Sequence, residues 1–177
     1  ANAAGGGLVA AGFDVTTIDL YAIDFDAVMS LAELDDYRNE RPTSDPLVAE
    51  HARLVQSVDI LVFVYPTWWS GLPAILKGWL ERVLVPGVAF DLDGDGKITG
   101  RLRNVDHIVG ISTYGSPWGY VKLVNDNGRR TLTRALRMLC GRRTATTWLG
   151  LYSLDTKGPA DRTAFLDRIH HTTSKLS

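Results

Sequence analysis

The amino-acid sequence predicts a doubly wound α/β domain built on a parallel sheet, and three observations support this class. Apolar, β-branched runs alternate with helical patterns along the chain. Residues 60–64 (ILVFV) are apolar on both faces, as a parallel strand covered by helices on each side requires. With 177 residues, 45% of them hydrophobic, the chain is long enough for one full core. Since we find no repeat, linker or domain boundary, we expect a single domain over residues 1–177.

The expected elements follow in order along the chain. Strands are predicted at 15–20, 59–65, 107–113 and 145–153. A capping box of Ser30 and Glu33 opens a predicted helix at 30–39, and Asp45 is a candidate cap for a helix at 46–57. Further helical patterns cover 73–84, a long segment from about 122 to 140, and 160–171.

Composition narrows the possible functions. The net charge of -1 and the pI near 6.5 leave no basic surplus to neutralise a phosphate backbone, so we expect no nucleic-acid partner. No apolar run approaches membrane-spanning length, and no signal peptide is visible. The single cysteine, Cys140, cannot form an internal disulfide. Together these features predict a cytoplasmic protein without a membrane span.

Residues 91–102 (DLDGDGKITGRL) resemble a calcium-binding loop. Asp91, Asp93 and Asp95 stand at the first, third and fifth positions, where an EF-hand places its ligands. The twelfth position, which requires a bidentate Glu, is Leu102, and neither flank reads as a helix. The segment is therefore predicted to be a surface turn and not a calcium site.

Aromatic residues follow two of the predicted strands. In open parallel sheets, ligands bind beyond the carboxyl ends of the strands. Tyr65, Trp68 and Trp69 follow the strand at 59–65, and Trp118 and Tyr120 follow the strand at 107–113. These side chains could stack on a flat, conjugated ligand, or they could cap the core or fill a subunit interface. Composition alone leaves both interpretations open.

Residues 63–90 (FVYPTWWSGLPAILKGWLERVLVPGVAF) resemble the signature of the flavodoxin-like NAD(P)H:quinone oxidoreductases, the DT-diaphorase type and its bacterial relatives. The similarity runs from about residue 11 to residue 120 and weakens after about 150. It implies a flavodoxin-like sheet of order 2-1-3-4-5, bound FAD or FMN, and NAD(P)H as the hydride donor. It also implies a quinone or similar small aromatic acceptor, ping-pong kinetics and a homodimer.

The resemblance carries over to individual residues. One family loop lies along the flavin ring, and a second meets its pyrimidine end; the matching residues are Pro66, Thr67, Trp68 and Trp69, then Ser112, Thr113, Tyr114 and Gly115. Tyr120 matches the family's active-site tyrosine. Asp126 stands where the best-studied branch has a histidine, which leaves the acid–base chemistry open. Lys77 and Gly78 match the signature and are predicted to be structural.

The beginning of the chain departs from the family pattern. A family member opens with a strand and a phosphate-binding loop, whereas residues 1–15 already match the first helix. We therefore expect the first strand to be missing and the domain to be N-terminally incomplete, which leaves a gap between 15–20 and 59–65. Residues 5–10 fit G-x-G-x-x-A, but no strand precedes them, so we discount a dinucleotide fingerprint. Asn2 offers weak support for a family asparagine.

The remaining candidates have plain interpretations. The four histidines, at 51, 107, 170 and 171, lack metal-ligand spacing, and Cys140 reads as a packed thiol. Basic residues from Arg129 to Arg143 favour a solvated helix face over a site for the phosphates of NADPH. A second hypothesis remains beside the enzyme: a non-catalytic flavodoxin-like regulatory subunit that binds a partner protein, with weak or lost flavin binding.

Overall fold

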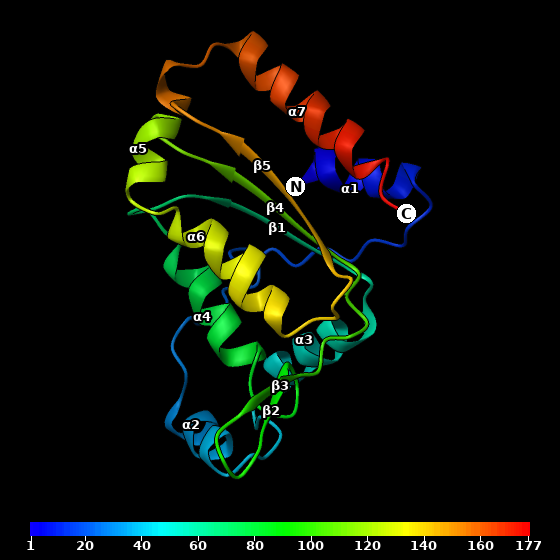
Figure 1. Ribbon diagram of the computed structural model, residues 1–177, viewed down its shortest axis with the longest axis vertical. Coiled ribbons are helices and arrows are strands. Elements are labelled where there is room, and N and C mark those ends of the chain that lie inside the picture. The colour runs from blue at the N-terminus through cyan, green and yellow to red at the C-terminus, as the bar shows by residue number, and fades with distance from the viewer.

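The computed structural model describes residues 1–177 and has a central sheet of three parallel strands (Figure 1). The strands β1 (Ile60–Pro66), β4 (His107–Thr113) and β5 (Ala145–Leu151) lie side by side in that order. Their register is even, so all three strands end at the same edge of the sheet. The predicted parallel α/β class is confirmed, with β5 ending at Leu151 and not at residue 153.

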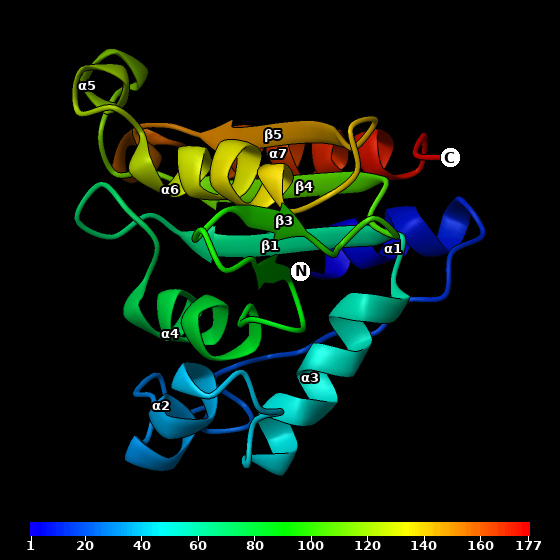
Figure 2. The same ribbon diagram turned by 60° about the horizontal axis from the view of Figure 1, so that its bottom comes forward.

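Helices cover both faces of the sheet (Figure 2). On one face, α1 (Asn2–Ala10) and α7 (Pro159–Thr173) pack on a small core that includes Val109 and Ile111. On the other face, α3 (Pro46–Ser57), α4 (Ala74–Val83) and the π-helix η1 (Thr131–Leu136) enclose the larger core. Side chains alternate between the two faces along each strand, which is why the strands are apolar on both sides.

Local signals set where these helices begin. In α2 (Leu31–Arg38), the Ser30 side chain accepts from the Glu33 backbone, and the Glu33 carboxylate accepts from the Ser30 backbone. The Asp45 carboxylate accepts the backbone N–H groups of Leu47 and Val48 at the start of α3. Both predicted caps are therefore confirmed. None of the helices is long and apolar enough to cross a membrane.

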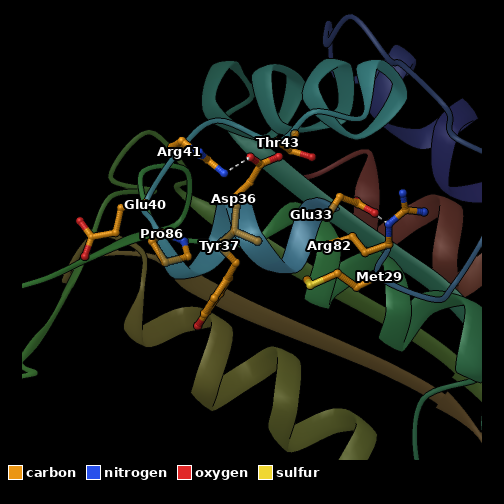
Figure 3. A pocket seen from close by; sticks show the side chains of 10 residues that line it. Met29, Glu33, Asp36, Tyr37, Glu40, Arg41, Thr43, Arg82 and Pro86 are labelled. Carbon is orange, nitrogen blue, oxygen red and sulfur yellow. Dashed lines mark hydrogen bonds and ion pairs between the residues drawn. The ribbon is translucent and has the colours of Figure 1, made fainter. Parts of the chain in front are cut away.

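A buried arginine ties α2, α3 and α4 together, and Figure 3 shows its contact with Glu33. Arg82 Nε donates to Glu33 Oε1 over 2.8 Å, Nη2 donates to Asp45 Oδ2 over 2.7 Å, and Nη1 donates to the Asp26 carbonyl over 2.6 Å. We call Arg82, Glu33, Asp45 and the Asp26 carbonyl the Arg82 cluster. Burial alone would raise the pKa of Glu33, but hydrogen bonds from Arg82 and Ser30 outweigh it and hold that pKa below its ordinary value. The adjoining hollow of about 10 Å³ is only large enough for one water.

Two predictions about individual elements are wrong. Residues 15–20 form no strand, because the segment has no neighbouring strand with which to form a ladder, and β1 pairs only with β4. The segment 122–140 is not one continuous helix. It is divided into α5 (Trp118–Leu123), α6 (Asn127–Arg130) and η1, because Asn125 and Asp126 adopt left-handed backbone conformations between α5 and α6.

Two deceptive motifs have structural explanations. Residues 91–102 span a hairpin of β2 (Phe90–Leu92) and β3 (Ile98–Gly100), in which the Asp93 carboxylate accepts from the Asp95 and Lys97 backbone as the predicted turn requires. Gly7, within the G-x-G-x-x-A run, lies in α1 directly against Thr173 of α7, and a β-carbon there would overlap the Thr173 hydroxyl. The glycine run therefore serves helix packing.

Candidate functional site

Two loops meet at the carboxyl edge of the sheet, one after β1 and one after β4. The Thr67 amide donates to the Thr113 carbonyl over 2.8 Å, and the Thr67 and Ser112 hydroxyls form a second hydrogen bond of 2.8 Å. Ser112 is almost fully buried, so this second bond anchors the loops to the sheet. The two groups of residues that the sequence assigned to the flavin are thus brought together on one rim.

The first loop contains a tight turn with an unusual backbone. Trp68 and Gly71 exchange two backbone hydrogen bonds across it, and the central residues Trp69 and Ser70 have φ angles of 45° and 58°. Left-handed conformations at two non-glycine residues cost on the order of 1–3 kcal/mol each and cluster at functional sites. This turn holds the Trp69 side chain fully in solvent.

Of the five aromatic residues predicted at the mouth, all but one are exposed. Trp68, Trp118 and Tyr120 are each more than half exposed, and Trp118 and Tyr120 belong to α5, which projects from this edge in Figure 1. Tyr65 is the exception, because it is 5% exposed and points into the larger core. The predicted aromatic mouth therefore consists of four residues and not five.

Backbone amides in both loops donate no hydrogen bond within the protein, among them those of Trp69, Ser70, Gly115 and Ser116. By contrast, Thr67, Trp68 and Tyr114 donate their amides to the carbonyls of Thr113, Gly71 and Leu151. Because these amides lie on solvent-accessible loop residues, water can satisfy them, and a bound molecule could take its place as the acceptor.

A polar and aromatic group lies behind these loops, on the sheet face that α6 and η1 cover. Tyr114 Oη donates to Asp126 Oδ1 over 3.1 Å, and the Tyr114 and Tyr152 rings stack with centroids 4.6 Å apart. The Tyr65 and Trp148 rings meet edge to face at 6.3 Å. We call these five residues the Asp126 cluster. Tyr65 Oη and Trp148 Nε1 are the two buried side-chain polar atoms of the protein without a hydrogen-bond partner.

Burial dominates the electrostatics of the Asp126 cluster. It raises the pKa of Asp126 above the ordinary carboxyl value, although the Tyr114 hydrogen bond and Arg129 act in the opposite direction. Burial also raises the pKa values of Tyr65 and Tyr114, and the nearby Asp126 charge raises them further. Side chains with shifted pKa values are enriched at functional sites.

Sequence reasoning recognised the two loops but missed part of what lies behind them. Tyr152 and Trp148 were not singled out, although Tyr152 follows the carboxyl end of β5, where the ligand-edge rule directs attention. Trp148 lies within β5 and carries no such signal. Tyr114 was assigned to the loop, and the structure places its side chain in the cluster with only 2% exposed.

The other candidates lie outside this site or have structural partners. The Cys140 thiol donates to the Leu136 carbonyl, and burial raises its pKa to about 11, as expected of a packed thiol. His51 is buried and accepts a hydrogen bond from Trp79 Nε1. Arg137 donates to the Thr144 and Arg142 carbonyls. We find no group of three or more His, Cys, Asp or Glu side chains arranged to hold a metal ion.

The fold is that of an α/β protein with a parallel sheet, a class in which ligands bind at the carboxyl edge of the sheet. The sequence matches the family described as "Flavodoxin-like fold" over residues 1–169, so the chain belongs to the flavodoxin-like family.

Two curated relatives carry oxidoreductase names. The chain is 40% identical over 93 residues to an NAD(P)H oxidoreductase of Haemophilus influenzae, which covers 52% of this chain and 45% of that protein. It is 31% identical over 131 residues to mouse ribosyldihydronicotinamide dehydrogenase [quinone], covering 63% and 54%. The chain thus spans about half the length of the curated relatives that it matches.

Structural similarity extends over nearly the whole chain. An FMN-dependent NADH-azoreductase of Bacillus anthracis, solved in complex with FMN, superposes with a TM-score of 0.71 at 15% identity. The alignment covers 99% of this chain and 89% of the azoreductase. At this level of identity the similarity establishes a shared fold.

Proposed function

We propose that this chain is part of a flavin-dependent NAD(P)H:quinone oxidoreductase. The proposal rests on the rim, where two loops that are hydrogen-bonded to each other present unpaired backbone amides beside exposed aromatic rings. A flat, conjugated ring with hydrogen-bonding edges is the kind of ligand that such a surface suits. The oxidoreductase names of both curated relatives, and the FMN of the azoreductase, support the same assignment.

The residues present fit a flavin ring. Trp68 and Trp69 offer exposed faces for stacking, and the free amides of Trp69 and Gly115 are donors for the polar edge of the ring. A bound flavin would supply the two-electron chemistry. Donors held in place by the loops would stabilise negative charge that develops during reduction, without reorganising at that moment.

The rest of the proposal concerns the substrates and assembly. NAD(P)H and a quinone would occupy the same aromatic slot in turn, which gives ping-pong kinetics. Tyr120, half exposed on α5, is the side chain we assign to substrate contact. We further infer a homodimer and a cytoplasmic location. The choices between FAD and FMN, and between NADH and NADPH, are left to experiment.

The direct test is the visible absorption spectrum of the purified protein, followed by titration with FMN and FAD. We expect bound flavin that NAD(P)H bleaches and a quinone restores. Failure to bind either flavin would contradict the proposal. Flavin that binds without being reduced by NAD(P)H would instead favour the regulatory-subunit hypothesis.

A variant pair sharpens this test. Trp69→Ala removes a fully exposed ring, so it should leave stability unchanged and weaken flavin binding about three- to ten-fold, the range that one stacking contact supplies. Met138→Ala is the control, because it removes a comparably exposed apolar side chain after η1, away from the rim. Equal flavin affinity in both variants would show that Trp69 does not contact the flavin.

A further inference from the structure

A hollow of about 320 Å³ lies between the segment 100–103 and the turn at 140–142. Its lining residues are Gly100, Arg103, Cys140, Gly141 and Arg142. The two segments lead into the amino ends of β4 and β5, whereas the aromatic rim follows the carboxyl ends of the strands. Because a seven-residue strand spans about 20 Å, a small molecule in the hollow would not touch the rim. The hollow is therefore separate from the candidate flavin site.

Backbone contacts fix the two sides of the hollow to each other. The Leu102 amide donates to the Leu139 carbonyl over 3.0 Å, and Leu102 forms an isolated parallel bridge with Cys140. A β-carbon at Gly100 would overlap the Leu139 backbone, so the two chain segments approach as closely as a glycine permits. The Leu102 side chain is fully buried in the larger core, which anchors this contact. The spacing between the two sides is therefore set by the fold.

The turn itself is held in place by hydrogen bonds. Arg137 Nε donates to the Thr144 carbonyl over 2.7 Å, and the Thr144 amide donates to the Gly141 carbonyl over 3.1 Å. The buried Thr144 hydroxyl donates to the Val105 carbonyl, in the segment before β4, over 2.8 Å. None of these bonds involves the Arg142 side chain, which is left available for a ligand.

The two charged side chains that line the hollow are arginines without a partner in the protein. Neither Arg103 nor Arg142 forms an ion pair, and neither guanidinium group donates a hydrogen bond, whereas nearby Arg101 pairs with Asp91. No carboxylate lines the hollow. The backbone amides of Arg142 and Arg143 also have no acceptor within the protein, so water or a ligand can accept from them. The hollow thus combines positive charge and hydrogen-bond donors with no neutralising group.

We propose that this hollow binds a phosphorylated small molecule, whose phosphate group is held by Arg103 and Arg142. Guanidinium groups bind phosphate through paired, charge-assisted hydrogen bonds. The volume lies in the range of small-molecule sites and leaves room for a sugar-sized group beside the phosphate. The net charge of -1 argues against an extended polyanion such as nucleic acid. This inference is independent of the proposed oxidoreductase function.

Calorimetric titration of the purified protein with ribose 5-phosphate, inorganic phosphate and ribose tests the proposal. We expect ribose 5-phosphate to bind at one site, inorganic phosphate to bind that site more weakly, and ribose not to bind. If neither phosphate compound binds at concentrations up to about 10 mM, the proposal is overturned. Equal affinities for ribose 5-phosphate and inorganic phosphate would overturn the claim that the site takes a ligand larger than phosphate.

Three variants locate the binding. Arg103→Gln and Arg142→Gln should each weaken the binding of ribose 5-phosphate about ten-fold, because each removes one guanidinium group. Their unfolding free energies should match the wild type, since neither guanidinium group has a partner in the protein. Arg134→Gln is the matched control, because it removes an exposed arginine of η1 that does not line the hollow. Equal losses of affinity in all three variants would show a general attraction of charge and would contradict a site in the hollow.

The rim provides the last control. Trp69→Ala should keep the wild-type affinity for ribose 5-phosphate, and saturation with FMN should leave that affinity unchanged. If Trp69→Ala or FMN abolishes the binding and Arg142→Gln does not, ribose 5-phosphate binds at the rim and the inference is overturned. A protein that binds ribose 5-phosphate as described but binds no flavin would contradict the proposed function alone.

Discussion

The Arg82 cluster and the Asp126 cluster are both built around buried charge, but they treat it in opposite ways. In the Arg82 cluster, three nitrogen atoms of the guanidinium group each donate to an oxygen within 2.8 Å, and the carboxyl pKa values are lowered. In the Asp126 cluster, the carboxyl group accepts from the Tyr114 hydroxyl and the Arg129 backbone, yet burial still raises its pKa, and two nearby polar atoms lack partners. The two sites differ in how completely their polar groups are satisfied.

The difference indicates that the Arg82 cluster stabilises the fold, whereas the Asp126 cluster belongs to the candidate ligand site. A satisfied network stabilises one arrangement, and here it fixes the start of α2, the start of α3 and the 25–27 segment on α4. An incompletely satisfied network beside a ligand rim keeps a group that can change its protonation state. Natural proteins tend to tolerate polar groups without a full set of partners at the sites where they bind ligands.

The largest expected effect comes from breaking the Arg82 cluster. Arg82→Met would leave Glu33 and Asp45 without their cation while keeping much of the side-chain volume. Because Arg82 and Glu33 are about 5% exposed, we expect the free energy of unfolding to fall by about 3–5 kcal/mol. Chemical denaturation of the variant and the wild type measures this loss.

The control lies on the same helix. Lys77 and Glu81 form an exposed ion pair at i, i+4, so Lys77→Ala should cost no more than about 0.5 kcal/mol. Similar losses in Arg82→Met and Lys77→Ala would contradict the view that the Arg82 cluster supports the fold.

The sequence correctly predicted those features that depend on a few neighbouring residues. The capping box at Ser30, the Asp45 cap and the two-sided apolar strands were predicted because each signal lies within a few neighbouring residues. The Arg82 cluster was missed, since Glu33, Asp45 and Arg82 are distant in sequence and only the tertiary fold brings them together. The failed strand at 15–20 shows the same limit, because a β-prone segment needs a pairing partner that propensity cannot supply.

The candidate site likewise has one part that the sequence indicated and one part that it did not. Resemblance supplied the two rim loops, because their residues are contiguous. It could not reveal that Tyr65 and Tyr114 turn inward, because both stand among aromatics that look equivalent in the sequence. The meeting of Asp126, Tyr114, Tyr152 and Trp148 depends on the left-handed break before α6. The turn-prone run at 125–128 (NDNG) signals this break, but the prediction of one long helix overlooked it.

The second prediction concerns packing beside the Arg82 cluster. A β-carbon at Gly78 would overlap the Ala27 carbonyl, one residue from the Asp26 carbonyl that Arg82 binds. Gly78→Ala should therefore cost about 1–3 kcal/mol of unfolding free energy, despite the better helix propensity of alanine. Gly119→Ala in α5, where no atom lies within 4 Å of the added carbon, should cost nothing. Thermal or chemical denaturation compares the two, and equal stability would show that the 26–28 segment can move away.

The third prediction uses opposite pH dependences. The lowered pKa of Glu33 contributes stability that is present above its ordinary value of 4.5 and is lost as the pH falls through the folded-state pKa. The raised pKa of Asp126 acts in reverse, because stability is lost as the pH rises above 3.8 through the folded-state pKa.

Asp126→Asn should therefore stabilise the protein at neutral pH, by about 0.5–2 kcal/mol, and the gain should disappear in acid. Unfolding free energies measured across the pH range check this. Glu33→Gln is the matched variant, and it should destabilise the protein at neutral pH. If both variants are less stable than the wild type at neutral pH, the ionised carboxyl group stabilises the fold in both clusters, and the contrast between them is wrong.

The smallest expected effect falls on the hydroxyl group that distinguishes the two clusters most directly. Tyr65→Phe removes a buried hydroxyl without a partner and keeps the ring against Trp148, so the unfolding free energy should stay constant or rise by up to about 1 kcal/mol. Tyr114→Phe makes the same chemical change in the same cluster but removes a hydrogen bond to a carboxylate, which should cost about 1.5–3 kcal/mol. If Tyr65→Phe is as costly as Tyr114→Phe, the Tyr65 hydroxyl has a partner such as an internal water. The Asp126 cluster would then be satisfied like the Arg82 cluster, and the contrast between them would rest on Asp126 alone.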